Sequence, residues 1–360
     1  MRGKSRLKIL FSALLIPFLF SCASASVFDK VYPALNDGKY DSEFPYKNSS
    51  SQLEEISGSI RLLNSIAFYT SYVFDPSSKI LASQVSSINP GKKAVEQISF
   101  NRSASGTATI IAEDQGSVAL ISVAHIVSFP DTIISHFINE DGSFSPYIQS
   151  VSIKTKQTNY IPDFPDNGEV EIILIDKSQD VALLGRHFLP SATVSLPVFK
   201  YPWGKSSELE WGSFVYVFGF PMNYKMISKA IVSSPHKEKH SFVIDAVFNR
   251  GYSGGIVLAI RDGVPNFELV GLVRSVPAEF QSTLRPLTKD QNFDFNPLLP
   301  YKGEYYVDKE QVIRTGITKV IGIEVLIDFL IENKEKLISK GYPIRSLFNA
   351  PDNPVIKFVH

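Results

Sequence analysis

The chain reads Gly251-Tyr252-Ser253-Gly254-Gly255 between a strand-like run at residues 242–248 and an apolar run at 256–258. Apolar runs of this length beside glycines are typical of buried β-strands, so the pattern predicts that the serine lies in a tight turn between two strands. The glycines leave the serine hydroxyl uncrowded and allow backbone N–H groups to point at one place. By itself the stretch fits either a nucleophilic serine or an ordinary glycine turn.

Two further segments supply the residue types that a nucleophilic serine needs. The apolar run 118–123 is followed by Ala124 and His125, and among the six histidines only His125 follows such a run and small residues. Asp180 directly precedes the apolar residues 181–184. A serine hydroxyl becomes a good nucleophile when an imidazole takes its proton and a carboxylate fixes the tautomer of that imidazole. Taken singly, a buried structural histidine and an exposed turn aspartate are the alternatives.

In this order, the three segments resemble the motifs of trypsin-like serine proteases of the chymotrypsin fold. The bacterial HtrA-like branch is more similar, because residues 245–255 resemble its Asp-Ala-x-Ile-Asn-Pro-Gly-Asn-Ser-Gly-Gly motif. Residues 105–111, 219–221 and 231–233 resemble its strand before the histidine hairpin, its Gly-x-Pro turn and its Gly-Ile-Val-Ser strand. The α/β-hydrolases also use Gly-x-Ser-x-Gly, but their histidine follows the serine, and here only His360 does so.

The resemblance implies a serine endopeptidase that cleaves proteins or peptides through an acyl-enzyme. His125 would be the general base, Asp180 the acid that orients it, and Ser253 the nucleophile, with the N–H groups of Gly251 and Ser253 as the oxyanion hole. This chemistry requires no metal and no cofactor. The pair His236 and His240 is interpreted as part of a solvated loop and not as metal ligands.

Three positions depart from the family pattern. Arg250 replaces a proline of the HtrA-like motif, and Tyr252 replaces the aspartate that pairs with a new N-terminus in digestive-type proteases. Val247 lies six residues before the serine, where the floor of the substrate pocket is expected, and residues 269–274, including Leu272, are expected in its wall. An uncharged floor predicts cleavage after small or aliphatic residues, not after Arg or Lys.

The fold implied by the resemblance is all-β, with two antiparallel six-stranded β-barrels and a C-terminal helix. Strand-like runs lie at residues 107–112, 118–123, 148–155, 170–175, 214–218, 242–248 and 269–273, and a helical pattern follows near the end of the chain. The expected peptidase domain covers residues 53–345, with barrel one at about 60–190, barrel two at about 195–320, the helix at about 322–340 and a tail at 346–360. Residues 278–307 are polar, aromatic and rich in turn-forming residues, which predicts a long surface loop. The residues after Lys340 are too few for a PDZ domain.

The first residues have the pattern of a signal peptide. Four basic residues within the first eight precede an uncharged apolar run at 9–20, and the single cysteine, Cys22, stands where a lipoprotein would be acylated. We therefore expect a signal peptide at 1–21, a linker at 22–52 and export to a bacterial cell envelope, with a membrane anchor on Cys22. The alternative is ordinary cleavage after Ala25 and release of the protein.

Composition narrows the class of function further. The 36 basic and 36 acidic residues cancel, so no nucleic-acid partner is expected, and 44% hydrophobic residues exclude general disorder. Two alternatives to an endopeptidase remain. One is a catalytically silent surface lipoprotein that binds other proteins through a protease-like scaffold, and the other is an esterase with the same nucleophile.

Overall fold

The structure is a computed structural model, and it describes residues 36–45, 47–114, 116–188, 196–238, 240–246, 251–275, 278–286, 305–313, 316–342 and 347. The predicted signal peptide, Cys22, Val247, Arg250 and His360 lie outside these residues. No helix in the described part of the chain is long and apolar enough to cross a membrane.

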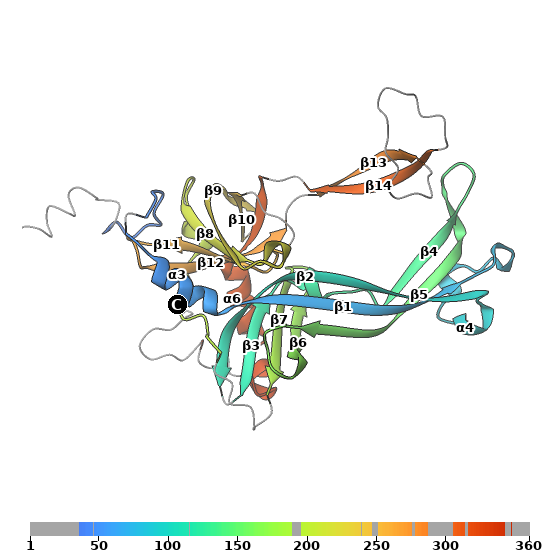
Figure 1. Ribbon diagram of the computed structural model, residues 1–360, viewed down its shortest axis with the longest axis horizontal. Coiled ribbons are helices and arrows are strands. Elements are labelled where there is room, and N and C mark those ends of the chain that lie inside the picture. Colours follow the sequence, from blue (N-terminus) through green and yellow to red (C-terminus); the bar gives the residue numbers. More distant parts are fainter. Residues whose placement is uncertain are drawn as a thin grey trace, which may run out of the picture.

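The first half of the described chain forms a closed barrel of six antiparallel strands (Figure 1). Its strands follow one another around the ring in the order β1 (Ile60–Val73), β2 (Glu96–Asp114), β3 (Ser117–Ser122), β7 (Val181–His187), β6 (Glu169–Asp176) and β5 (Phe144–Tyr160). Pairing of β5 with β1 closes the ring, and β4 (Thr132–Ile138) adds to the far end of β5. We call this unit barrel one.

The second half forms another closed barrel of six antiparallel strands, which we call barrel two. Its order is β10 (Ser241–Asp245), β15 (Thr318–Gly322), β12 (Phe267–Ser275), β11 (Ile256–Ile260), β8 (Phe214–Gly219) and β9 (Met226–Glu238). The short helices α6 (Ile323–Glu332) and α7 (Lys334–Ser339) follow the last strand. The predicted fold class, two six-stranded antiparallel barrels with C-terminal helical structure, is confirmed.

The apolar runs seen in the sequence are buried on both faces of their strands. In β8, Val215 and Val217 belong to the apolar cluster inside barrel two, whereas the alternate residues Phe214, Tyr216 and Phe218 belong to a larger cluster. This larger cluster also contains the core of barrel one and the buried face of α6. Successive side chains of a strand point to opposite faces, so a strand between two apolar regions has no polar position. The two barrels are therefore joined by a continuous apolar core.

The strands β1, β2 and β5 extend well beyond barrel one and form an arm with β4 (Figure 1). The end of the arm holds the short helix α4 (Pro90–Lys93) and a small separate apolar cluster around Phe74, Ile80, Ile148 and Val151. The first eight residues of β2 are all exposed, and most of them are polar, as expected where a strand has no core to cover. The sequence analysis did not predict this arm.

Two expectations for the C-terminal third need correction. The stretch 278–307 is not a loop throughout, because β13 (Ala278–Pro286) and β14 (Tyr305–Ile313) pair along their whole length as a two-stranded ribbon. Its many polar residues suit a ribbon that lies apart from the barrels, as Figure 1 shows. The expected single helix is divided at Asn333, which separates α6 from α7.

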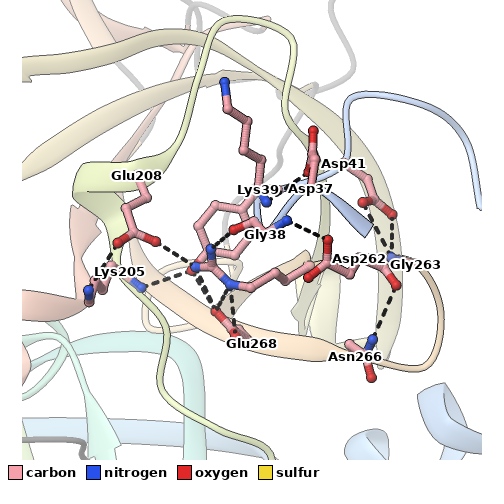
Figure 2. Close-up of polar contacts among 12 residues, drawn as sticks. Asp37, Gly38, Lys39, Asp41, Lys205, Glu208, Asp262, Gly263, Asn266 and Glu268 are labelled. Carbon is pink, nitrogen blue, oxygen red and sulfur yellow. Dashed lines mark hydrogen bonds and ion pairs between the residues drawn. The ribbon is translucent and has the colours of Figure 1, made fainter. Parts of the chain in front are cut away.

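The expected linker at 22–52 is wrong for its second half, because residues 37–41 pack on barrel two (Figure 2). Tyr40 is buried, donates a hydrogen bond to Oε2 of Glu268 at 2.7 Å, and lies under the guanidinium of Arg261 at 4.1 Å from its ring centroid. Asp41 is also buried and accepts a hydrogen bond from the N–H of Gly263. Long-range contacts of this kind leave no periodic pattern in the sequence. Helix α3 (Ser50–Gly58) then leads into β1.

Asp41 provides a pH-dependent test of this attachment. Burial raises the pKa of Asp41 to about 6, against the opposing hydrogen bond from Gly263 and with help from the nearby carboxylates of Asp262 and Asp37. The folded-state pKa of Asp41 exceeds its unfolded value. The contribution of Asp41 to the stability of the folded chain is therefore complete below about pH 4, where the side chain is protonated, and is lost as the pH rises through 6. Asp41→Asn should therefore raise the free energy of unfolding by about 1 kcal/mol at pH 7.5, and this gain should vanish at pH 4.

Urea unfolding of both proteins at the two pH values measures this difference. The exposed Glu54 of α3 offers the control, since Glu54→Gln should change stability by less than about 0.5 kcal/mol at either pH. A stability gain for Asp41→Asn that is equal at both pH values would contradict the assignment.

Candidate active site

His125 is the exposed residue of a short buried turn at the end of β3. Helix α5 (Ala124–Val127) contains Ala124, Ile126 and Val127, all buried, whereas the His125 side chain is 44% exposed. The apolar residues on either side of the histidine pack into the barrel, and they leave the imidazole directed outward. The sequence pattern that singled out His125 therefore matches an accessible imidazole on a rigid support.

Asp180 lies beside His125 because their strands are neighbours. Strands β3 and β7 are antiparallel, with Ser122 opposite Ala182, so the residue that precedes β7 meets the turn that follows β3. The backbone N–H of Ala124 donates to the carbonyl of Asp180 at 3.2 Å, and Asp180 has a left-handed φ of 61°. The two segments are 55 residues apart in the chain and are brought together by this register.

The Asp180 carboxylate is bonded to both the ring and the backbone of His125. Nδ1 of the ring lies 2.9 Å from Oδ2 and 3.2 Å from Oδ1, and the backbone N–H of His125 donates to Oδ1 at 2.9 Å. The carboxylate side chain is only 10% exposed. An acceptor at this position fixes the tautomer with the proton on Nδ1, which leaves Nε2 free to accept a proton.

Ser253 occupies the corner of a tight turn. The N–H of Gly255 donates to the carbonyl of Tyr252 at 2.8 Å, and Gly254 has a φ of 80°, which is the geometry of a type II turn with glycine at its third residue. A Cβ on Gly254 would lie 2.1 Å from the carbonyl oxygen of Thr107, so space as well as conformation requires glycine. The serine side chain is partly exposed.

Thr107 of barrel one holds this turn of barrel two through three hydrogen bonds. Its N–H donates to the carbonyl of Ser253 at 2.8 Å, and its hydroxyl donates to the carbonyl of Gly251 at 2.8 Å and accepts from the N–H of Phe220 at 3.0 Å. The hydroxyl of Ser122, at the end of β3, donates to the Thr107 carbonyl at 2.7 Å. The serine turn is thus fastened to the strands that lead to His125.

The backbone at Gly251, one of the predicted oxyanion-hole residues, requires glycine. Gly251 has a φ of 111°, and a Cβ there would lie 2.1 Å from the carbonyl oxygen of Phe220. Neither its N–H nor that of Ser253 donates a hydrogen bond to any described residue. Between the described side chains of Ser253 and His125 there is likewise no hydrogen bond. Catalytic hydrogen bonds are often long without substrate and shorten when it binds.

Tyr252 serves the structure of the loop. It is buried in the core of barrel two, and its hydroxyl lies 2.6 Å from Oγ of Ser228. Burial raises the pKa of the Tyr252 hydroxyl above its usual range. The aromatic side chain at this position therefore anchors the serine turn in the barrel interior.

Of the two predicted pocket residues, Val247 and Leu272, the described part of the chain contains Leu272. Val247 lies outside the described residues, as does Arg250. Leu272 is 1% exposed and belongs to the large apolar core, so it supports the strand β12 and its side chain does not line an open surface. Val273, the next residue, belongs to the cluster inside barrel two, so Leu272 lies on the opposite face of β12, toward the larger core.

Arg274, which was expected from the sequence in the wall of the substrate pocket, forms an ion pair with Asp180 in the structure. Nε of Arg274 lies 3.4 Å from Oδ2 of Asp180, and the arginine side chain is 41% exposed. Strands β11 and β12 pair with Ile256 opposite Leu272, so the last residues of β12, which follow Leu272, meet the serine turn before β11. No local sequence signal links an arginine of barrel two to an aspartate of barrel one.

No family model and no curated protein matches the chain. Among solved structures it is similar to the thermostable serine protease AL20 from an extremophilic microorganism, at 11% identity and a TM-score of 0.32 over 58% of this chain and 85% of that chain. It is also similar to the protease Anisep from Arthrobacter nicotinovorans, at 8% identity and a TM-score of 0.33 over 72% of this chain and 93% of that one. Similarity at this level assigns no activity, so the chemistry has to be argued from the site.

The role of Thr107 can be tested by removing its hydroxyl. Thr107 is fully buried, so Thr107→Val preserves the shape but leaves the Phe220 N–H and the Gly251 carbonyl with only their long hydrogen bond to each other, at 3.4 Å. We expect the free energy of unfolding to fall by about 2 kcal/mol, measured by urea denaturation. Thr107→Ser keeps the hydroxyl and loses a methyl group, so it should cost about 1 kcal/mol. A smaller loss for Val than for Ser would contradict this role.

Proposed function

We propose that the chain is a serine endopeptidase of the trypsin-like type, with His125, Asp180 and Ser253 as its catalytic triad. The observation that carries the proposal is the contact between the buried Asp180 carboxylate and Nδ1 of the exposed His125, beside a serine turn that is hydrogen-bonded to the same barrel. The order of the three residues in the chain and the HtrA-like motifs around them support it.

In the proposed reaction, Nε2 of His125 takes the proton of the Ser253 hydroxyl while Oγ attacks the carbonyl carbon of the scissile peptide bond. The tetrahedral intermediate carries its negative charge on the former carbonyl oxygen, which the N–H groups of Gly251 and Ser253 would receive. His125 then gives the proton to the leaving amine, and an acyl group remains on Oγ. Water, activated by the same imidazole, hydrolyses this ester and regenerates the serine.

Asp180 has two tasks in this scheme. As acceptor from Nδ1–H, it holds the ring in the tautomer that can act as a base, and its charge stabilises the imidazolium that forms during attack. The Asp180 carboxylate also accepts a hydrogen bond from the backbone N–H of His125, which holds the carboxylate in place beside the ring. Ser253 and His125 must approach each other when substrate binds, because they are not hydrogen-bonded in this structure.

A fluorophosphonate probe tests this function, because it reacts with an activated serine and does not require the natural substrate. We expect labelling of the wild-type chain and none of Ser253→Ala. His125→Ala and Asp180→Asn should each lower the labelling rate by several orders of magnitude, with about 10⁴-fold as the guide for the acid.

Matched controls are Ser143→Ala and His136→Ala, which change the same residue types at the β4–β5 hairpin. Both should label at the wild-type rate. Labelling that survives in Ser253→Ala would contradict the assigned nucleophile.

The second candidate is a protease-like scaffold without catalysis, which binds other proteins. The absent hydrogen bond between Ser253 and His125 in the described structure favours this alternative. The probe separates the two, since a silent scaffold leaves the folded wild-type chain unlabelled.

The preference of the peptidase is proposed from the uncharged Val247 at the position of the pocket floor. A hydrophobic pocket discriminates by size and shape, with each methylene group worth about 1–3 kcal/mol. Digestion of a peptide library should therefore show small or aliphatic residues before the cleaved bond, at least about tenfold over Arg and Lys. A strict preference for Arg or Lys would overturn this proposal and leave the triad unaffected.

A further inference from the structure

Oδ2 of Asp180 is shared between the two barrels. It accepts from Nδ1 of His125 on its own barrel and lies 3.4 Å from Nε of Arg274 on β12 of barrel two. The other carboxylate oxygen, Oδ1, is bonded to the backbone and ring of His125. Among the described residues, Arg274 is therefore the cationic partner of this carboxylate besides the histidine itself.

Arg274 stands on the strand that also holds the serine turn. The preceding residue, Val273, accepts a hydrogen bond from the N–H of Gly254 at 2.8 Å and donates one to the carbonyl of Gly255 at 2.8 Å. A shift of β12 would thus move the guanidinium and the serine turn together. This places the partner of the acid and the support of the nucleophile on two consecutive residues.

We propose, on the basis of the proposed function, that Arg274 is a positioning residue that couples Asp180 of barrel one to the serine turn of barrel two. The guanidinium contacts Oδ2 and the main chain of His125 donates to Oδ1, so both oxygens are held and the carboxylate keeps its orientation toward Nδ1. Arg274 does not touch reacting atoms, and its effect on the reaction passes through Asp180.

The energetics of the pair predict an effect on rate and little effect on folding. An ion pair in which the arginine is 41% exposed is screened by water and contributes little to stability. Small displacements of a catalytic group, however, lower rates by up to roughly 100-fold. Loss of Arg274 should therefore reduce the rate of the chemical step at unchanged thermal stability and unchanged binding of the probe.

The test measures fluorophosphonate labelling of the full chain at several probe concentrations, which separates the maximal rate of inactivation from probe affinity. Arg274→Met should lower the maximal rate about tenfold or more and change the half-saturating concentration by less than about twofold. Arg274→Lys, which keeps the charge, should retain more of the rate than Arg274→Met. The melting temperature of each variant shows that it is folded.

The double variant with Asp180→Asn distinguishes positioning from a general structural role. If Arg274 acts through the carboxylate, Arg274→Met should add less than about a twofold loss once Asp180 is an amide. Arg285→Met is the matched control, because Arg285 forms an Arg–Asp pair with Asp308 at similar exposure on the β13–β14 ribbon. It should label at the wild-type rate.

The outcomes separate the two proposals. An unlabelled wild-type chain would overturn the proposed function and this inference with it. A labelled wild type together with Arg274→Met at the wild-type rate would overturn the inference alone, and so would losses that multiply in full with Asp180→Asn.

Discussion

The hydrogen bond from the N–H of Thr107 to the carbonyl of Ser253 is the constraint on which the site depends. It joins a strand of barrel one to the turn of barrel two that carries the proposed nucleophile. The Thr107 hydroxyl adds bonds to Gly251 and Phe220, and the glycine at 254 allows the backbones to approach closely. Buried backbone groups need hydrogen-bond partners, and at this contact the polar groups of one barrel are the partners of the backbone groups of the other.

Around this contact, the site is assembled from the ends of neighbouring strands. His125 follows β3 and Asp180 precedes β7, while Ser253 precedes β11 and Arg274 lies near the end of β12. Antiparallel pairing places the end of one strand beside the start of the next, so His125 meets Asp180 at an edge of barrel one and the turn of Ser253 meets the end of β12 at an edge of barrel two. The continuous core that joins the barrels keeps these edges together. Rigid strands at the base and short turns at the surface suit a site that must hold its geometry.

Barrel two carries a second set of polar contacts away from the proposed site. Tyr40, Arg261 and Glu268 attach the N-terminal segment to barrel two, where Tyr40 joins the apolar cluster of the barrel, and Asp41 accepts a hydrogen bond from Gly263 (Figure 2). The chain is therefore packed against barrel two already at Tyr40, before α3 and β1 begin. The arm on barrel one and the β13–β14 ribbon extend the protein in other directions, as Figure 1 shows.

The sequence predicted a chain rich in short strands, because apolar runs and glycine turns are local patterns with a direct structural meaning, and the resemblance of its motifs to trypsin-like proteases implied the two-barrel fold class. It also singled out His125, Asp180 and Ser253 from their neighbours and their order, and the structure places His125 and Asp180 in direct contact. Only the tertiary structure decided the bonds of Thr107 to the serine turn, the ion pair of Arg274 with Asp180 and the attachment of Tyr40 to barrel two. Each of these joins residues that are more than 90 positions apart in the chain, and such pairs depend on strand register and barrel packing, which no short stretch of sequence encodes.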